Sequence, residues 1–113
     1  MNLVIFDLDN TLLKGDSDYN WALFLIKKGF IDKESYEQKN EQFYEDYQNG
    51  SLDVFKYCEF QFKVLKNNER EIIEQLREQY LQEVILPMIP DKAYELVEHH
   101  KRKNEKLLII TST

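Results

Sequence analysis

The sequence has little of what marks disulfide-rich, turn-rich or membrane-spanning proteins. It contains a single cysteine, Cys58, two prolines and three glycines among 113 residues. One cysteine excludes an intramolecular disulfide framework and any metal site built from several cysteines. So few prolines and glycines predict few turns and a mostly helical chain. The longest aliphatic run, residues 107–110, is far too short to cross a bilayer.

Basic residues are also in deficit. The chain has 15 Lys and Arg against 21 Asp and Glu, a formal net charge of −6 at pH 7. Nucleic acids and anionic membranes are bound through clustered lysine and arginine, so this balance argues against both as partners. Asp7 and Asp9 interrupt the N-terminal apolar run, so no signal peptide is expected. With 42% hydrophobic residues, a packed cytoplasmic domain of undefined oligomeric state is the default expectation.

The hydrophobic pattern predicts two short strands separated by a long helical region. Residues 2–8 form a continuous apolar run, typical of a strand buried on both faces, and residues 106–111 form a second. Helical spacing predicts five helices between them, which begin near Asp18, Asp32 or Ser35, Ser51, Asn68 and Asp91. Parallel strands this far apart are not joined by a minimal crossover, so an inserted helical subdomain is expected.

Two carboxylates, Asp7 and Asp9, follow the first predicted strand in the sequence Asp-Leu-Asp-Asn-Thr. In an open α/β sheet, ligands bind at the carboxyl ends of the strands. Like charges this close repel each other and favour a cation or a shared proton. Mg²⁺ fits because it binds few protein carboxylates and leaves room for a phosphate. The alternative is a structural Asp-rich turn in which Asn10 and Thr11 cap local backbone groups.

These residues resemble known motifs. Residues 5–13, Ile-Phe-Asp-Leu-Asp-Asn-Thr-Leu-Leu, resemble the first motif of the haloacid dehalogenase (HAD) superfamily of phosphotransferases, and residues 108–111 resemble the second. The chain between them is similar to the HAD-IB branch, which includes the phosphoserine phosphatases. Residues 14–17, 49–52 and 86–90 stand where that branch has its Gly-Asp-Ser segment, its helical cap and its Ile-Pro connector.

The resemblance implies an α/β fold that is predominantly helical overall. Residues 1–14 and 87–113 are expected to form a partial Rossmann-like HAD core of two parallel strands plus a helix. Residues 15–86 are expected to form an all-helical cap subdomain. Two of the four HAD motifs fall within the chain.

Carried over to this sequence, the resemblance implies a role for each matching residue. Asp7 is the nucleophile that forms an aspartyl-phosphate, and Asp9 is the general acid and base. Mg²⁺ lies against the Asp7 carboxylate and the backbone carbonyl of Asp9. Thr111 donates its hydroxyl to a phosphoryl oxygen, and Thr11 and Asp16 complete the contacts with substrate or phosphate. For Asp16, a helix N-cap is an equally good interpretation.

The third and fourth HAD motifs, which supply a lysine and an acidic pair, lie beyond the second. The chain is therefore expected to be the front part of a Mg²⁺-dependent phosphatase acting on a small phosphorylated metabolite, truncated after motif two and inactive or weakly active alone. One alternative is a non-catalytic interaction module on residues 33–86 with a vestigial HAD base. Another is a glycosyltransferase-like Asp-x-Asp site for Mn²⁺, which the N-terminal position of the motif disfavours.

The 15 aromatic residues concentrate in the helical insert, and two interpretations are open for them. The favoured interpretation is that these side chains pack between helices. The alternative is that a few of them cover the aspartate site and exclude water from it. A basic tract, residues 99–103, is expected to be the solvated last turn of a helix. The insert aromatics are Phe43, Tyr44, Tyr47, Phe55, Tyr57, Phe60 and Phe62.

Overall fold

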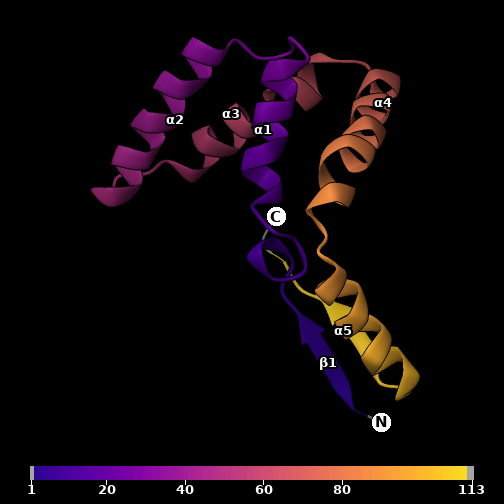
Figure 1. The fold of residues 1–113 in the computed structure, drawn as a ribbon. Helices are drawn as coiled ribbons and strands as arrows, with labels where there is room; N and C mark the ends of the chain where they lie inside the picture. The colour runs from indigo at the N-terminus through magenta and orange to yellow at the C-terminus, as the bar shows by residue number, and fades with distance from the viewer. Residues whose placement is uncertain (1, 112–113) are drawn as a thin grey trace. The chain divides into compact units, whose positions relative to one another are not determined.

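A computed structural model describes residues 2–111 and contains five α-helices and two strands within that range (Figure 1). The order of strand, four helices, helix and strand confirms the prediction. The elements are β1 (Leu3–Phe6), α1 (Ser17–Lys27), α2 (Lys33–Gln48), α3 (Val54–Asn67), α4 (Arg70–Tyr80), α5 (Asp91–Arg102) and β2 (Lys106–Ile109). Short irregular helical turns lie at Leu8–Leu12, Leu81–Ile85 and Leu86–Met88.

The chain divides into two compact units. One unit combines the chain up to Trp21 with the chain from Glu78 onward, and it contains both strands and α5. The other unit is Ala22–Arg77, and it contains α2 and α3. Helices α1 and α4 each begin in one unit and end in the other. Among the described residues, no helix is long and apolar enough to span a membrane.

The two strands pair in parallel, as the sequence predicts, and the register runs from Leu3 opposite Lys106 to Phe6 opposite Ile109. Beyond β2, the Ile110 amide donates to the Phe6 carbonyl at 2.9 Å and extends the ladder by one bond. The first residue after β1 therefore lies beside the chain that leaves β2. This edge is the carboxyl end of the sheet, where ligands bind in open α/β folds.

One face of the sheet is covered and the other is open. Phe6 packs with Leu12 and with Ala93 of α5 in a small core, and α5 runs alongside β1 (Figure 1). Side chains alternate along a strand, so Leu3 and Ile5 point to the opposite face, where both are 55% exposed. Burial on both faces is therefore wrong for the described residues, because helices cover only one side of this sheet.

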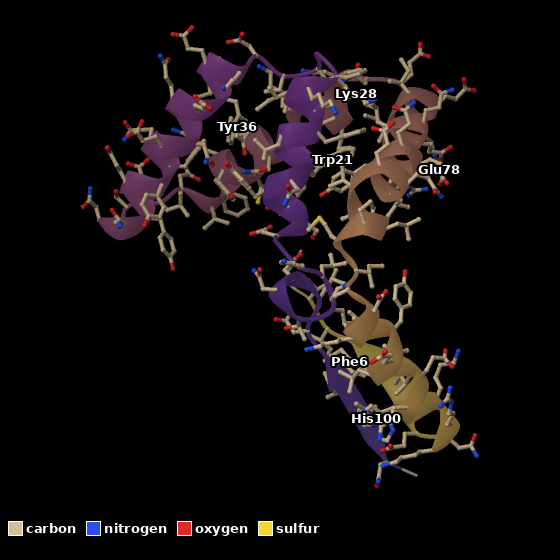
Figure 2. The ribbon with its side chains drawn as sticks, viewed as in Figure 1. Phe6, Trp21, Lys28, Tyr36, Glu78 and His100 are labelled. Atoms are coloured by element: carbon tan, nitrogen blue, oxygen red, sulfur yellow. The ribbon has the colours of Figure 1, made fainter. Side chains whose placement is uncertain are left out.

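The end of α5 carries the basic tract, as predicted. His99, Lys101 and Arg102 are exposed in the last turn, where cations oppose the negative end of the helix dipole. His100 is different, because its ring meets the edge of Phe6 at a centroid distance of 6.0 Å (Figure 2). Its Nδ1 lies 2.9 Å from a carboxylate oxygen of Glu105.

Aspartates cap two helices of the second unit. Asp32 accepts the Ser35 amide at 3.0 Å and starts α2 as predicted. Asp53 accepts the Phe55 and Lys56 amides at 3.1 and 3.2 Å and starts α3. The predicted cap at Ser51 is two residues too early, since the Ser51 hydroxyl donates to the chain at the end of α2.

Three of the insert aromatics pack between helices. Phe60 of α3 stacks on Tyr36 of α2 at 5.2 Å and meets Phe43 at the same distance, and Phe43 meets Tyr57 edge-on at 5.4 Å. The packing interpretation is confirmed for Phe43, Tyr57 and Phe60. It is wrong for four others, which are exposed: Tyr44, Tyr47, Phe55 and Phe62.

Candidate functional site

The chain turns immediately after β1, at Asp7. Asp7 keeps an extended backbone and its side-chain Oδ1 accepts the Leu8 amide at 2.8 Å. The residue is exposed, and its other carboxylate oxygen has no partner among residues 2–111. Asp7 therefore presents a carboxylate oxygen to solvent at the carboxyl edge of the sheet.

The turn that follows Asp7 is closed by backbone hydrogen bonds. Asn10 adopts a left-handed conformation (φ 57°), which asparagine tolerates better than most residues. Its amide donates to the Gly15 carbonyl at 3.0 Å. The Lys14 amide donates to the Met88 carbonyl at 2.7 Å, so the turn is tied to the short connector before α5. The chain around Asp9 is thus fixed at both ends.

Gly15 has a backbone conformation (φ 137°) that residues with a Cβ atom rarely adopt. An added Cβ would also lie 2.8 Å from Cε of Met88, although that flexible end can move. We expect Gly15→Ala to lower the free energy of unfolding by about 1–3 kcal/mol, mainly through backbone strain. Urea denaturation measures the loss. Gly50→Ala is the control, since Gly50 (φ 73°) has open space around it, and an equal loss in both variants would contradict the assignment of the larger strain to Gly15.

Asp9 is positioned by the first turn of α1. Its Oδ1 accepts the Ser17 amide at 2.8 Å, which also satisfies one of the unpaired amides at the start of the helix. Asp9 has an extended backbone (φ −67°, ψ 132°) just before the left-handed Asn10, and the residue is half-buried. The hydrogen bond fixes the carboxylate in one orientation, as a group that transfers a proton requires.

Ser17 is held from a second direction by Tyr80, at the end of α4. The Tyr80 hydroxyl donates to the Ser17 carbonyl, and the Tyr80 ring meets the edge of Trp21 at a centroid distance of 5.0 Å. Both Ser17 and Tyr80 are buried. The Ser17 hydroxyl oxygen is itself buried and has no partner among the described residues. Tyr80 therefore supports the residue that orients Asp9.

We expect Tyr80→Phe to lower the free energy of unfolding by about 1–2 kcal/mol, because the Ser17 carbonyl loses its donor in a buried place. Tyr94→Phe on the exposed face of α5 is the matched control and is expected to change little.

The pKa of Tyr80 gives this prediction a pH dependence. Burial raises that pKa above its ordinary value of 10.0, and the negative charges of Asp18, Asp9 and Asp16 raise it further. The folded state therefore favours the neutral phenol, so the stabilisation by Tyr80 is present below pH 10 and is lost as the pH rises above it. Unfolding curves from pH 8 to 11 are expected to show the gap between the parent chain and Tyr80→Phe closing. A gap that is constant with pH would contradict the argument.

Asp16 caps helix α1. Its Oδ1 accepts the Asp18 and Tyr19 amides at 2.9 and 3.0 Å, and its carbonyl accepts the side-chain amide of Asn20 at 2.7 Å. The helix-cap interpretation of Asp16 is confirmed. No residue 2–111 pairs with its second carboxylate oxygen.

The start of α1 is strongly acidic. Burial raises the pKa of Asp18, and the neighbouring charges of Asp16 and Asp9 raise it further. Each of these carboxylates therefore lies in the negative field of the others, and a phosphate brought here meets the same field. A bound cation would offset this negative charge.

The donors at this edge suit Mg²⁺. Asp7 offers an exposed carboxylate, a hard oxygen ligand of the kind that Mg²⁺ prefers. Within residues 2–111, no group of three or more His, Cys, Asp and Glu is arranged to hold a metal. Mg²⁺ is commonly held by one or two carboxylates with water and substrate phosphate, so Asp7 and Asp9 fit as part of such a ligand set.

The two threonines assigned to phosphate lie in different elements. Thr111 follows Ile110, whose amide extends the ladder onto Phe6, so Thr111 and Asp7 leave neighbouring strand ends. Thr11 is exposed in the turn between β1 and α1. The structure brings Asp9, Asp16 and Ser17 together at the start of α1.

Sequence reasoning missed the residues that support this site. Ser17 belongs to the predicted Gly-Asp-Ser segment, but no role was predicted for it or for Tyr80. Their contact joins residues 63 positions apart. Met88, which ties down the turn through its carbonyl, was only part of a connector. A buried aromatic with a polar tip, such as Tyr80, was the one available signal, because a buried hydroxyl needs a partner.

Comparisons with known proteins agree with the motifs. The sequence profile of the haloacid dehalogenase-like hydrolase family matches residues 4–113. A protein of Neisseria meningitidis serogroup C (strain 8013) named histidinol-phosphatase is 41% identical over 112 residues, which are 99% of this chain and 50% of that protein.

A solved structure is similar over the whole chain. It is the crystal structure of a protein with unknown function from Bordetella pertussis Tohama I, with a TM-score of 0.83 and 29% identity. The similarity covers 100% of this chain and 52% of that one. The chain therefore spans about half the length of the relatives it matches.

Proposed function

Because the chain belongs to the haloacid dehalogenase-like hydrolase family, we propose that it provides the nucleophile and the acid–base group of a Mg²⁺-dependent phosphatase of the HAD-IB branch. The observation that carries this proposal is the pair of aspartates after β1. Asp7 is exposed at the carboxyl edge of the sheet, and the Asp9 carboxylate is oriented by the Ser17 amide. The relative named histidinol-phosphatase supports phosphatase chemistry.

The proposed reaction has two steps, and both use the aspartates. An Asp7 oxygen attacks phosphorus and forms an aspartyl-phosphate, while Asp9 gives a proton to the departing alkoxide. Asp9 then takes a proton from a water molecule that attacks the same phosphorus. Phosphate leaves, and the Asp7 carboxylate is regenerated. Mg²⁺, when bound, offsets the negative charge of the phosphate and the carboxylates.

Three further residues are proposed to contact phosphate or substrate. Thr111 leaves β2 next to Asp7 and donates its hydroxyl to a phosphoryl oxygen. Thr11, in the exposed turn, makes a second phosphate contact. Asp16 contacts substrate through the carboxylate oxygen that its helix cap does not use.

The acidic start of α1 favours a substrate with a positive group. Histidinol phosphate, the substrate implied by the name of the Neisseria relative, carries an ammonium group beside its phosphate. Asp16 and Asp18 lie at the start of α1, where the pKa of Asp18 is raised in part by the Asp16 charge. An ammonium group would offset this repulsion. We propose a small cationic phosphomonoester, with histidinol phosphate as the first compound to assay.

We also propose that residues 1–113 provide only part of the catalytic site. The resemblance to HAD enzymes implies a further lysine and an acidic pair for the phosphate and the metal. The exposed sheet face at Leu3 and Ile5 supports this, since HAD-like α/β sheets are covered on both faces. The matched relatives are about twice as long.

The test compares the chain alone with a chimera in which it replaces the matched segment of the Neisseria relative. With an aryl phosphate and Mg²⁺, we expect turnover by the chimera and a rate at least about 10³-fold lower for the chain alone. Turnover by the chain alone at the rate of the chimera would overturn the partial-site proposal. A folded chimera without turnover on aryl phosphates or histidinol phosphate would overturn the phosphatase proposal.

The four exposed aromatics of α2 and α3 favour an interaction module as a second candidate. Phe55 is the most exposed of them, at 84%. This candidate predicts a partner whose binding is weakened by Phe55→Ser and unchanged by Asp7→Asn. Phosphatase activity of the chimera that requires Asp7 would rule out a purely structural role for the aspartate pair.

A further inference from the structure

A groove between α2 and α3 concentrates positive charge in this acidic protein. The groove has a volume of about 580 Å³ and lies wholly within the unit Ala22–Arg77. Four lysines line it, Lys39 from α2 and Lys56, Lys63 and Lys66 from α3, against one acidic residue, Glu59. Four positive charges minus one negative charge leave an excess of three, in a chain whose net charge is −6.

The lysines are available to bind an anion. All four are exposed, and none takes part in an ion pair within residues 2–111. Lys56 and Lys66 lie ten residues apart on one helix, with Lys63 between them, which is about 15 Å at 1.5 Å per residue. Unpaired like charges repel, so an anion that bridges them stabilises the folded unit. Their spread suits several anionic groups in a row better than a single phosphate.

Two aromatic residues also line the groove. They are Phe43 and Phe60, whose rings are 5.2 Å apart and tilted by 37°. A second hollow of about 200 Å³ shares Lys39, Phe60 and Lys63 with the groove and is also lined by Tyr36, which stacks on Phe60. A flat ring can pack against an aromatic side chain in such a groove while cations face its polar part.

We infer that this groove binds a nucleoside polyphosphate, with its phosphates on the lysines and its base against Phe43 and Phe60. The volume lies in the range of small-molecule sites, roughly 300–1,000 Å³. The two aromatic residues in the lining favour such a ligand over inorganic polyphosphate, which has no ring. The inference does not depend on the proposed phosphatase activity, since every residue it uses lies outside the aspartate site.

The test is binding of ATP to the whole chain in the presence of EDTA, measured by isothermal titration calorimetry and by amide NMR shifts. We expect ATP to bind about tenfold more tightly than AMP, because most of the charge contacts involve the outer phosphates. Tripolyphosphate is expected to bind at least about threefold more weakly than ATP, since it lacks the base. The shifts are expected at residues of α2 and α3.

Matched variants separate the groove from general charge effects. Lys39→Gln with Lys63→Gln removes two groove lysines and is expected to weaken ATP binding by about tenfold. Lys33→Gln with Lys92→Gln makes the same change of net charge at exposed positions outside the groove, and less than about twofold weakening is expected. Both pairs lie on the surface, so circular dichroism is expected to show intact helices.

The inference would be overturned by no binding of ATP, by equal weakening in the two double variants, by tripolyphosphate binding as tightly as ATP, or by a glutamate-rich peptide binding more tightly than ATP. The last would assign the groove to a protein partner. Loss of ATP binding in Asp7→Asn would place the nucleotide at the aspartate site instead. That result would contradict nucleotide binding in the groove but not the phosphatase proposal, so the experiments test the two proposals independently.

Discussion

Asp7→Asn is expected to lower kcat of the chimera by about 10³-fold or more and to abolish the phosphoenzyme. The reason is chemical, because a carboxamide oxygen does not attack phosphorus as a carboxylate oxygen does. The Asp7 side chain accepts one hydrogen bond within residues 2–111, from the Leu8 amide, and the asparagine oxygen can accept the same bond. The fold is therefore expected to survive. Rapid-quench assays with labelled aryl phosphate measure the covalent intermediate, and a beryllofluoride adduct provides an independent readout at the same residue.

Asp32→Asn is the matched control for this variant. Asp32 is also an aspartate that accepts a backbone amide through its side chain, and it caps α2 in the other unit. Asparagine is nearly as good a cap, so the activity of the chimera is expected to stay within about twofold. If Asp7→Asn keeps full activity and still forms a phosphoenzyme, Asp7 is not the nucleophile. The structural-turn interpretation of the Asp-Leu-Asp-Asn-Thr segment then becomes the better one.

The sequence predicted those parts of the fold that depend on local pattern. Helix α2 begins where Asp32 caps it, and α5 begins at Asp91, because caps and apolar spacing act over a few residues. The parallel pairing of β1 with β2 also follows from the pattern, since both strands are short apolar runs. Which of the strand residues are buried could not be predicted from the pattern. Leu3 and Val4 are equally apolar, and only the helix that covers one side of the sheet decides that Leu3 is exposed.

The same limit applies to the aromatic residues. Phe55 and Phe60 lie five residues apart on α3, and nothing in their chemistry separates them. Phe60 faces Tyr36 and Phe43 of α2, whereas Phe55 is 84% exposed. The direction in which α3 faces its neighbour depends on contacts between distant segments, which a local pattern does not encode.

The candidate site also contains residues that could be predicted from sequence and residues that could not. Motif resemblance pointed to Asp7 and Asp9, and their place at the end of a strand could be predicted from the apolar run before them. The hydrogen bonds from Ser17 to Asp9 and from Tyr80 to Ser17 could not, because each needs residues that meet only in the folded chain. The place of the two aspartates after β1 was therefore predictable from sequence, whereas the residues that orient Asp9 were not.

Asp9→Asn is expected to lower kcat of the chimera by about 10²- to 10⁴-fold, the usual contribution of general acid–base catalysis. Asparagine keeps an oxygen that can accept the Ser17 amide but transfers no proton. The loss is therefore expected without a loss of stability. Asp9→Ala also removes the acceptor of that 2.8 Å bond and is expected to lower the free energy of unfolding by about a further 1 kcal/mol.

The choice of leaving group identifies the role of Asp9. A nitrophenolate needs little help from an acid, so Asp9→Asn is expected to form the phosphoenzyme from nitrophenyl phosphate at nearly the normal rate. Hydrolysis of the phosphoenzyme still needs a base, so the intermediate is expected to accumulate. With an alkyl phosphate both steps are slow and little intermediate forms. A defect of equal size with both substrates, without accumulation, would show that Asp9 acts through charge or position, and would assign the proton transfer to another group.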